Sequence, residues 1–291
     1  MINFREFKFR SENIIARIVF NIFAILPIDI ASSISGWICR TICPHLLVTN
    51  YARENLNRIF PNWSNSECEA VIVLMWNNIG RIIGEYPHIH KMTYGFGSRV
   101  EVCGIENIVK LRNDGLPGLF FSGHFGNWEI IGPCVVHHGI NLHLVYRAAT
   151  NPYTNWIFMY RSSNDKTEMI PKGISGAKKV IEKLNRGEHI GMIVDQKMNN
   201  GISVPFFGIE SNTAPALAVF ALKYKCPVVP VHVVRLDGAH FRIIFDSPIF
   251  FENTSDHNAD IKSAMTLINS IIESWIREYP DHWLWLHKRW S

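Results

Sequence analysis

The sequence lacks an uninterrupted apolar run that would make a clean membrane-spanning helix. Its longest apolar stretch, residues 14–42, is broken by Arg17, Asn21, Pro27 and Asp29. A charged side chain within such a segment is costly in hydrocarbon. The stretch also lacks the compact apolar region and cleavage site of a signal peptide.

Residues 1–50 are therefore interpreted as a membrane-associated N-terminal segment. A basic flank with Arg5, Lys8 and Arg10 precedes the apolar stretch, and this combination suits an amphipathic segment lying in the interface beside anionic headgroups. A helix hairpin packed on the protein's own core is the alternative. Residues 51–291 contain no convincing linker, repeat or low-complexity tract, which indicates one further domain.

Cysteine and charge also form none of the patterns that mark metal or nucleic-acid sites. The six cysteines include no CxxC pair, and the histidines at 88, 90, 137 and 138 have no partners at ligand spacing. We expect buried free thiols, no metal and no cofactor. The net charge of +4 is too small to indicate nucleic acid. It suits anionic partners such as phosphates, an acidic protein or an anionic membrane.

From residue 99 onward, strand-like apolar runs alternate with helical segments. We expect strands over residues 99–103, 116–122, 140–146, 168–171, 189–195, 227–235 and 241–245, and helices over 127–138, 151–161, 175–185, 213–225 and 259–277. This alternation predicts an α/β fold with a mostly parallel sheet flanked by helices. Upstream, residues 64–67 form a capping box that opens another helix.

Residues 118–129, GLFFSGHFGNWE, place a histidine at a ligand-binding position of such a fold. His124 follows a buried strand, and Glu129 lies on the first turn of the next helix. Ligands of open α/β sheets bind at this edge, and an imidazole with a carboxylate in reach is a basic acid–base pair. An ordinary loop histidine is the alternative.

No protein nucleophile accompanies this histidine. The Gly-x-Ser-x-Gly turn of serine hydrolases is absent, because the nearest sequence, residues 173–176, has the wrong spacing. Phosphate-binding glycine patterns are absent too. A base without a nucleophile suits direct transfer, in which His124 deprotonates a substrate hydroxyl that attacks an acyl carbon. Glu129 would hold the imidazole tautomer.

Polar residues that follow other predicted elements are candidates for binding substrate. They are Arg147, Arg161, Asp195 and Gln196. An arginine at this edge could bind a phosphate or polarise a thioester carbonyl. A surface salt bridge is the alternative for each arginine, and loop capping or a structural ion pair is the alternative for Asp195.

Two further stretches are rich in aromatic residues. Residues 204–208, VPFFG, suit the wall of an acyl-chain path, with ordinary packing beneath a loop as the alternative. Residues 281–290 combine three Trp with basic residues, a composition that suits a membrane–water interface. A buried strand covering the core is the alternative.

Several stretches together resemble one family. SGHFGNWE (122–129) matches the HxxxxD/E motif of the glycerolipid-type acyltransferases, and the chain looks especially like the late acyltransferases of bacterial lipid A biosynthesis. The same order is kept by VYR at 145–147, Arg161, DQ at 195–196, VPFFG at 204–208, T-x-P-A-x-A at 213–218, PVVPV at 227–231 and W-x-W-x-H-x-R-W at 283–290. The family usually has Gln where this chain has His282.

The resemblance implies that His124 and Glu129 form a catalytic dyad, with Arg161 and Asp195 supporting substrate. Arg161 and backbone N–H groups near Asn127 would stabilise the oxyanion. The implied reaction moves a fatty acyl group from acyl carrier protein to a hydroxyacyl chain of a lipid A precursor, without a covalent acyl-enzyme. It would occur among membrane lipids at the cytoplasmic face of a bacterial inner membrane.

Three other functions compete with this one. The first is a related acyltransferase that uses another glycolipid or a lysophospholipid as acceptor, with acyl-CoA as donor. The second is a catalytically silent lipid-binding protein, which the intact pair of His124 and Glu129 disfavours. The third is a serine or cysteine lipase, which the missing nucleophile turn disfavours.

Overall fold

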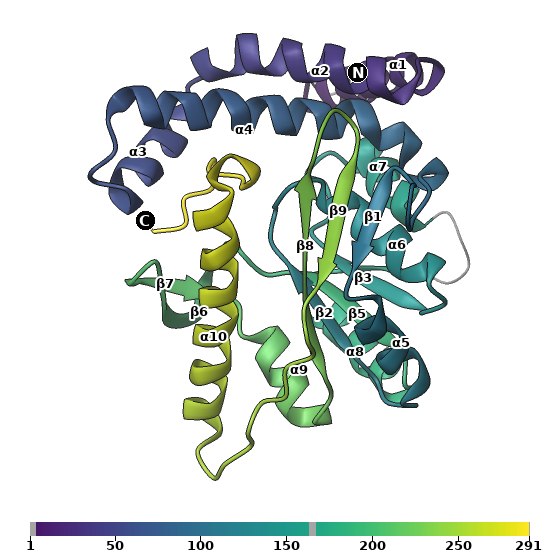
Figure 1. The fold of residues 1–291 in the computed structure, drawn as a ribbon, viewed down its shortest axis with the longest axis vertical. Coiled ribbons are helices and arrows are strands. Elements are labelled where there is room, and N and C mark those ends of the chain that lie inside the picture. Colours follow the sequence, from purple (N-terminus) through teal and green to yellow (C-terminus); the bar gives the residue numbers. More distant parts are fainter. Residues whose placement is uncertain (1–3, 163–166, 291) are drawn as a thin grey trace.

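The structure is a computed structural model that describes residues 4–162 and 167–290. Its strands are β1 (Val100–Cys103), β2 (Leu119–Ser122), β3 (Leu142–Tyr146), β4 (Met169–Pro171), β5 (His189–Ile193), β6 (Lys197–Phe206), β7 (Ile209–Thr213), β8 (Val228–Arg235) and β9 (Phe241–Phe245). Seven of them form one sheet in the order β1-β9-β8-β2-β5-β3-β4 (Figure 1). The five strands from β8 to β4 are parallel, and β9 runs antiparallel to β8. The predicted mostly parallel sheet is confirmed.

Helices cover both faces of this sheet. They are α1 (Phe4–Ile25), α2 (Ile28–Ile42), α3 (Thr49–Ile59), α4 (Asn65–Glu85), α5 (Ile105–Asn113), α6 (Ile131–His137), α7 (Asn155–Met159), α8 (Ile174–Asn185), α9 (Ala216–Tyr224) and α10 (His257–Glu278). Short 3-10 turns are η1 (Cys43–His45), η2 (Tyr86–Lys91), η3 (Trp128–Ile130), η4 (Pro152–Thr154), η5 (Tyr160–Ser162) and η6 (Pro280–His282). α5 and α6 share one core with the sheet, and α8, α9 and α10 share the other. The sheet is therefore the middle of three layers.

α4 crosses the edge of the sheet where the parallel strands end (Figure 1). Its N-terminus has the predicted capping box: Ser64 accepts from the backbone of Glu67, and the Glu67 side chain accepts from the backbone of Ser64. α2 packs along α4, and their close approach depends on a small residue. A Cβ at Gly84 would lie 2.4 Å from the carbonyl oxygen of Ala31, so a larger side chain would separate the helices.

The N-terminal segment combines features of both interpretations made from the sequence. α2 buries Ala31, Ser32 and Ser35 against the rest of the protein, as expected of a packed hairpin. Both α1 and α2 nevertheless leave large apolar side chains in solvent, including Ile18 and Trp37. Among the described helices, none combines the length and the apolar character needed to cross a membrane.

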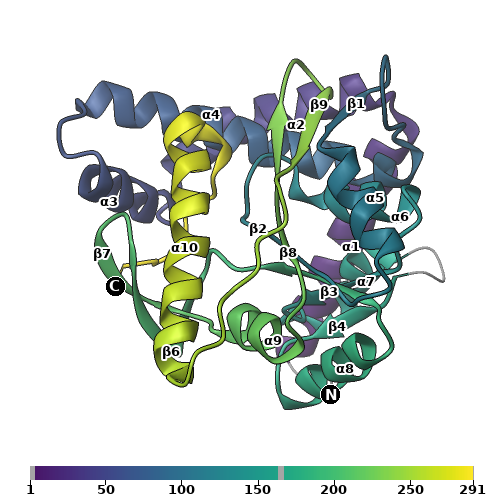
Figure 2. The same cartoon turned by 60° about the horizontal axis from the view of Figure 1, so that its bottom comes forward.

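Three local expectations are corrected by the structure. Residues 197–213, for which no strand was expected, form the β6–β7 hairpin, which lies beside α10 (Figure 2). Helix α5 was not predicted, and the helix expected over 151–161 is split into η4, α7 and η5. The hairpin has only a two-residue turn, Phe207-Gly208, with positive φ at both positions.

The aromatic tail lies in the core rather than at a lipid interface. Trp283 and Trp285 are 1% and 0% exposed, and Arg289 is fully buried. Arg289 donates to Ser211 Oγ and to Thr213 Oγ1 on β7, at 2.5 and 2.7 Å. The buried interpretation therefore holds, although the tail is irregular and pairs with the turn after β2 through a bridge between Phe125 and Trp283. Residues 204–208 likewise pack in this core.

Replacing Trp285 by Ala tests this correction. We expect a loss of about 3–5 kcal/mol in the free energy of unfolding, because a large core side chain is removed. Trp37→Ala is the matched control, since Trp37 is 57% exposed and its loss should cost no more than about 0.5 kcal/mol. Urea denaturation followed by circular dichroism measures both. Equal effects would contradict the buried placement.

Candidate active site

The turn after β2 carries the histidine and is shaped by a glycine. β2 is buried along its whole length, so the chain leaves the core only at the sheet edge. Gly126 has φ +56°, and a Cβ there would lie 1.8 Å from the carbonyl oxygen of Val233. Only glycine combines this backbone conformation with such close contact. The turn therefore packs directly against β8 and holds His124 at the edge.

Asp195, which follows β5, is the carboxylate that binds His124. Asp195 Oδ1 lies 2.8 Å from His124 Nδ1, and Asp195 Oδ2 accepts from the backbone N–H of His124 at 2.8 Å. The indole N–H of Trp283 donates to the same Oδ2, also at 2.8 Å. Glu129, expected in this position, makes no hydrogen bond to His124 among the described residues. The sequence expectation about which carboxylate holds the ring is corrected here.

This arrangement fixes the charge of Asp195 and the tautomer of His124. Burial alone would raise the pKa of Asp195, but His124 and the N–H groups around the carboxylate lower it to about 2. An ionised carboxylate only accepts hydrogen bonds, so the neutral ring carries its proton on Nδ1 and leaves Nε2 as a base. The stabilisation from Asp195 is present above about pH 4 and is lost as the pH falls towards 2.

Glu129 is instead the partner of Arg161. The two side chains form a buried ion pair, with 5% of Glu129 and 19% of Arg161 exposed. Burial would lower the pKa of Arg161, but Glu129 and Tyr86 more than offset this and raise it. Arg161 Nε and Glu129 Oε2 are both buried without a protein hydrogen-bond partner. The pair thus retains one buried donor and one buried acceptor.

His124 and this ion pair line the same cavity, which we call the histidine cavity. It has a volume of about 440 Å³. Most of its remaining wall is apolar and comes from α1, α4 and the segment around α7: Ala16, Val19, Phe20, Ile79, Ile82, Ile83, Tyr86, Trp128, Trp156, Ile157 and Phe158. A cavity of this size, mostly apolar with a few polar groups, is typical of a small-molecule site.

The other predicted substrate-binding residues lie elsewhere. Arg147 and Gln196 line a second cavity, which shares no lining residue with the histidine cavity. Asn127 is fully buried, and its amide donates to Glu85 Oε2 at 2.7 Å. Its side chain is therefore occupied within the protein. Of the predicted set, the structure brings together His124 with Asp195, and Glu129 with Arg161.

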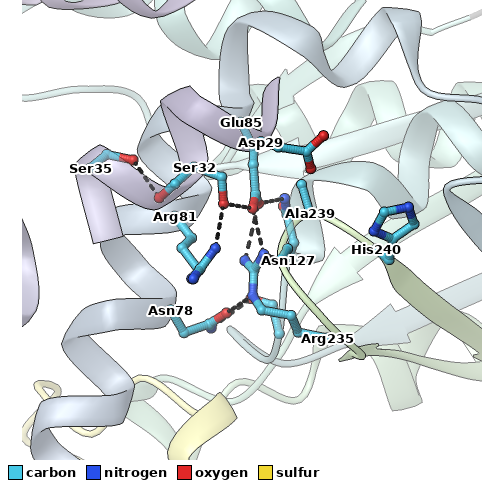
Figure 3. A network of polar contacts seen from close by, with 12 residues as sticks. Asp29, Ser32, Ser35, Asn78, Arg81, Glu85, Asn127, Arg235, Ala239 and His240 are labelled. Carbon is cyan, nitrogen blue, oxygen red and sulfur yellow. Dashed lines mark hydrogen bonds and ion pairs between the residues drawn. The ribbon is translucent and has the colours of Figure 1, made fainter. Parts of the chain in front are cut away.

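A buried polar network behind the turn was not anticipated from the sequence (Figure 3). Glu85, at the end of α4, is fully buried and forms an ion pair with Arg235, at the end of β8, whose side chain is 9% exposed. Ser32 on α2 also donates to Glu85, at 2.7 Å. Asn78 accepts from Arg235 Nε at 2.9 Å and donates to the carbonyl oxygen of Gly126 at 3.2 Å. One carboxylate thus joins α2, α4, β8 and the turn that carries His124.

The site residues that were not predicted differ in whether the sequence carries a signal for them. Trp283 belongs to a recognisable aromatic tail, whose burial could have been suspected from the density of Trp. Glu85 and Arg235 carry no local signal, because they are separated by 150 residues in the chain. Only the fold brings them together.

At this site a histidine held by a buried carboxylate lines a mostly apolar cavity, an arrangement typical of a general base beside a lipid-like substrate. The chain belongs to the bacterial lipid A biosynthesis acyltransferase family, whose model matches residues 9–291. It is an acyltransferase of lipid A biosynthesis.

Individual relatives agree with this assignment. The chain is 26% identical to a lipid A biosynthesis palmitoleoyltransferase of Escherichia coli K12, over 82% of this chain and 77% of that protein. It is 24% identical to a lauroyltransferase of the same organism, over 81% and 76%. A lipid A biosynthesis acyltransferase of Haemophilus influenzae is 23% identical over 81% and 73%. The crystal structure of a 1-acyl-sn-glycerophosphate acyltransferase from Thermotoga maritima superposes with a TM-score of 0.37 at 15% identity, covering 84% and 96%.

Replacing Glu85 by Gln tests the importance of the buried network. We expect the free energy of unfolding to fall by about 3 kcal/mol, because Arg235 then stays buried without its counter-ion. Glu101→Gln is the control: it breaks the exposed pair with Arg242 and should cost no more than about 1 kcal/mol. Urea denaturation compares them. Adding Arg235→Gln to Glu85→Gln should recover part of the loss, and no recovery would argue against an ion-pair origin.

Proposed function

We propose that this acyltransferase moves a fatty acyl group from an acyl carrier protein thioester to the hydroxyl of a hydroxyacyl chain on a lipid A precursor. The observation that carries the proposal is the geometry of His124. Its Nδ1 is held by a buried carboxylate, and its other ring nitrogen has no protein partner among the described residues. The ring lines a mostly apolar cavity in which an acyl chain could lie.

The proposed reaction has two steps and no covalent enzyme intermediate. His124 Nε2 takes the proton of the acceptor hydroxyl as its oxygen attacks the thioester carbonyl carbon, which forms the new C–O bond. The tetrahedral intermediate then collapses, the C–S bond breaks, and the imidazolium returns the proton to the leaving thiolate. Asp195 stabilises the imidazolium between these steps.

Arg161 is the proposed stabiliser of the developing oxyanion. It lines the same cavity as His124, and its buried Nε still has a donor without a protein partner. A fixed cation in a water-poor site stabilises developing negative charge strongly. The proposed role of Glu129 is to hold Arg161 in place through the buried ion pair, not to orient the imidazole.

The choice of acyl donor in this proposal is argued from the charge of the protein. The net charge of +4 supports an acidic carrier protein, because complementary charge speeds and orients association. Initial rates with acyl carrier protein and with acyl-CoA, at equal acyl length, distinguish the two donors. Faster transfer from acyl-CoA would contradict the carrier-protein donor.

Substitutions of Asp195 and Glu129 test whether the first orients His124 and the second holds Arg161. We expect Asp195→Asn to lower kcat by about 10³–10⁴-fold, because the wrong imidazole tautomer is then favoured. Glu129→Gln should lower kcat less, because Asp195 still fixes the tautomer of His124. Mass spectrometry of the acylated product gives the rates.

The matched reference for both variants is His124→Ala, which should abolish transfer while the protein stays folded by circular dichroism. Normal activity of a folded His124→Ala variant would contradict the general-base mechanism. A larger loss of kcat in Glu129→Gln than in Asp195→Asn would show that Glu129, not Asp195, orients the imidazole.

We also propose that the protein binds the cytoplasmic face of a bacterial inner membrane through α1 and α2. Large apolar side chains recur along one stripe of each helix and are exposed: Phe4, Phe7, Ile14, Ile18, Ile22 and Ile25 on α1, and Ile30, Ile34, Trp37, Ile38 and Ile42 on α2. Both helices lie at the end of the molecule beyond α4 (Figure 1). Apolar stripes flanked by basic residues suit in-plane binding to anionic lipid.

Vesicle binding tests this surface. We expect Ile18→Glu to weaken binding to phosphatidylglycerol-containing vesicles by about tenfold or more, because a charge replaces buried apolar area. Leu267→Glu is the control, since Leu267 is 43% exposed but lies on α10. Sedimentation with vesicles measures both. An equal loss for the two variants, or none for Ile18→Glu, would contradict the proposed surface.

A further inference from the structure

The second cavity, which we call the lateral cavity, lies at the ends of β3, β4 and β5 on the side of α8 and α9. It has a volume of about 360 Å³, within the range of small-molecule sites. Its inner wall is apolar and is formed by Val145, Val180, Met192, Leu217 and Phe220. The proposed mechanism leaves this cavity without a role.

Three cations line the lateral cavity: Arg147, Lys172 and Lys197. Among the described residues, none of these three side chains has an ion-pair or hydrogen-bond partner. Desolvation lowers the pKa of Lys172, Asp195 raises it, and Arg147 lowers it further. Lys172 is thus within electrostatic range of both Asp195 and Arg147. The oxygens of Asp195 already accept from His124 and Trp283, so the cations lack a dedicated anion.

The lateral cavity is adjacent to the catalytic pair without containing it. Val194 and Gln196, the chain neighbours of Asp195, line it, whereas His124 lines only the histidine cavity. Transfer between two lipids must hold two hydrocarbon groups close to one base. Two mostly apolar cavities lie beside the pair formed by His124 and Asp195: His124 lines one, and the chain neighbours of Asp195 line the other.

We propose that the lateral cavity binds the acceptor lipid through an alkyl chain and a phosphate ester, with the phosphate held by Arg147, Lys172 and Lys197. This inference rests on the proposed function and assigns its acceptor to a place. A doubly charged phosphate suits three converging cations. The alkyl chain suits the apolar wall. The histidine cavity is then left for the acyl chain of the donor.

Decyl phosphate is the probe, added below its micellar concentration to the full-length protein and followed by isothermal titration calorimetry. We expect wild-type protein to bind it more tightly than inorganic phosphate or decanol, because each of these lacks half of the ligand. Binding should weaken with added salt. Equal affinity for inorganic phosphate would overturn the chain-binding part. Equal affinity for decanol would overturn the anion-binding part.

Two variants separate the charge from the cavity. Arg147→Gln with Lys172→Gln should raise the Kd for decyl phosphate by about tenfold or more, while Lys178→Gln, on the exposed side of α8, should leave it unchanged. Ala177→Trp should also weaken binding, since Ala177 lines the cavity but is exposed enough to accept a larger side chain. Unchanged Kd values in both test variants would overturn the site.

Steady-state kinetics identifies the occupant. The Arg147→Gln, Lys172→Gln variant should raise the KM for the lipid A precursor by about tenfold and leave the KM for the acyl donor unchanged, because only the acceptor loses its phosphate contacts. A rise only in the donor KM would assign the phosphate to the donor and overturn the proposal. So would displacement of decyl phosphate by phosphatidylglycerol vesicles but not by the precursor, because the site would then take bilayer lipid.

Failure of this inference is distinct from failure of the proposed function. Decyl phosphate binding needs no catalysis and should be the same in His124→Ala as in wild type. Wild-type protein that acylates the precursor but shows no change in the double variant contradicts only the lateral cavity. Wild-type protein that binds decyl phosphate through the two cations, yet acylates no precursor, contradicts the proposed function.

Discussion

The buried carboxylate of Asp195 connects three parts of the chain that are far apart in sequence. It accepts from the backbone and the ring of His124 after β2, and from the indole of Trp283 in the tail. A buried anion is tolerated only where such donors surround it. The folding of the sheet, the position of His124 and the docking of the tail therefore depend on one another.

Two further carboxylates near the site are neutralised in separate pairs. Glu129 holds Arg161 inside the histidine cavity, and Glu85 holds Arg235 behind the turn. Each pair carries one carboxylate and one guanidinium, so neither leaves a net charge beside Asp195. This separation lets the histidine interact with a single anion, while Arg161 stays available to a substrate oxygen. Burial costs each pair desolvation, and around Glu85 the hydrogen bonds donated by Ser32 and Asn127 offset part of this cost.

The sequence predicted what depends on local pattern. The strand ending near His124 and the position of Asp195 at the same sheet edge follow from apolar periodicity and from the rule that parallel strands end together. The choice between Glu129 and Asp195 as partner of His124 does not follow, because both lie within plausible reach and only the direction of each side chain decides. The burial of Trp285 was equally open, since Trp suits a core and an interface alike.

The tail also bears on the order of events during synthesis. Trp283 follows every strand of the sheet in the chain, yet its indole is needed to complete the surroundings of Asp195. A nascent chain whose sheet has already formed still lacks that donor while the tail is within the ribosome. The pair proposed to catalyse transfer, His124 and Asp195, is therefore complete only once synthesis has passed the tail.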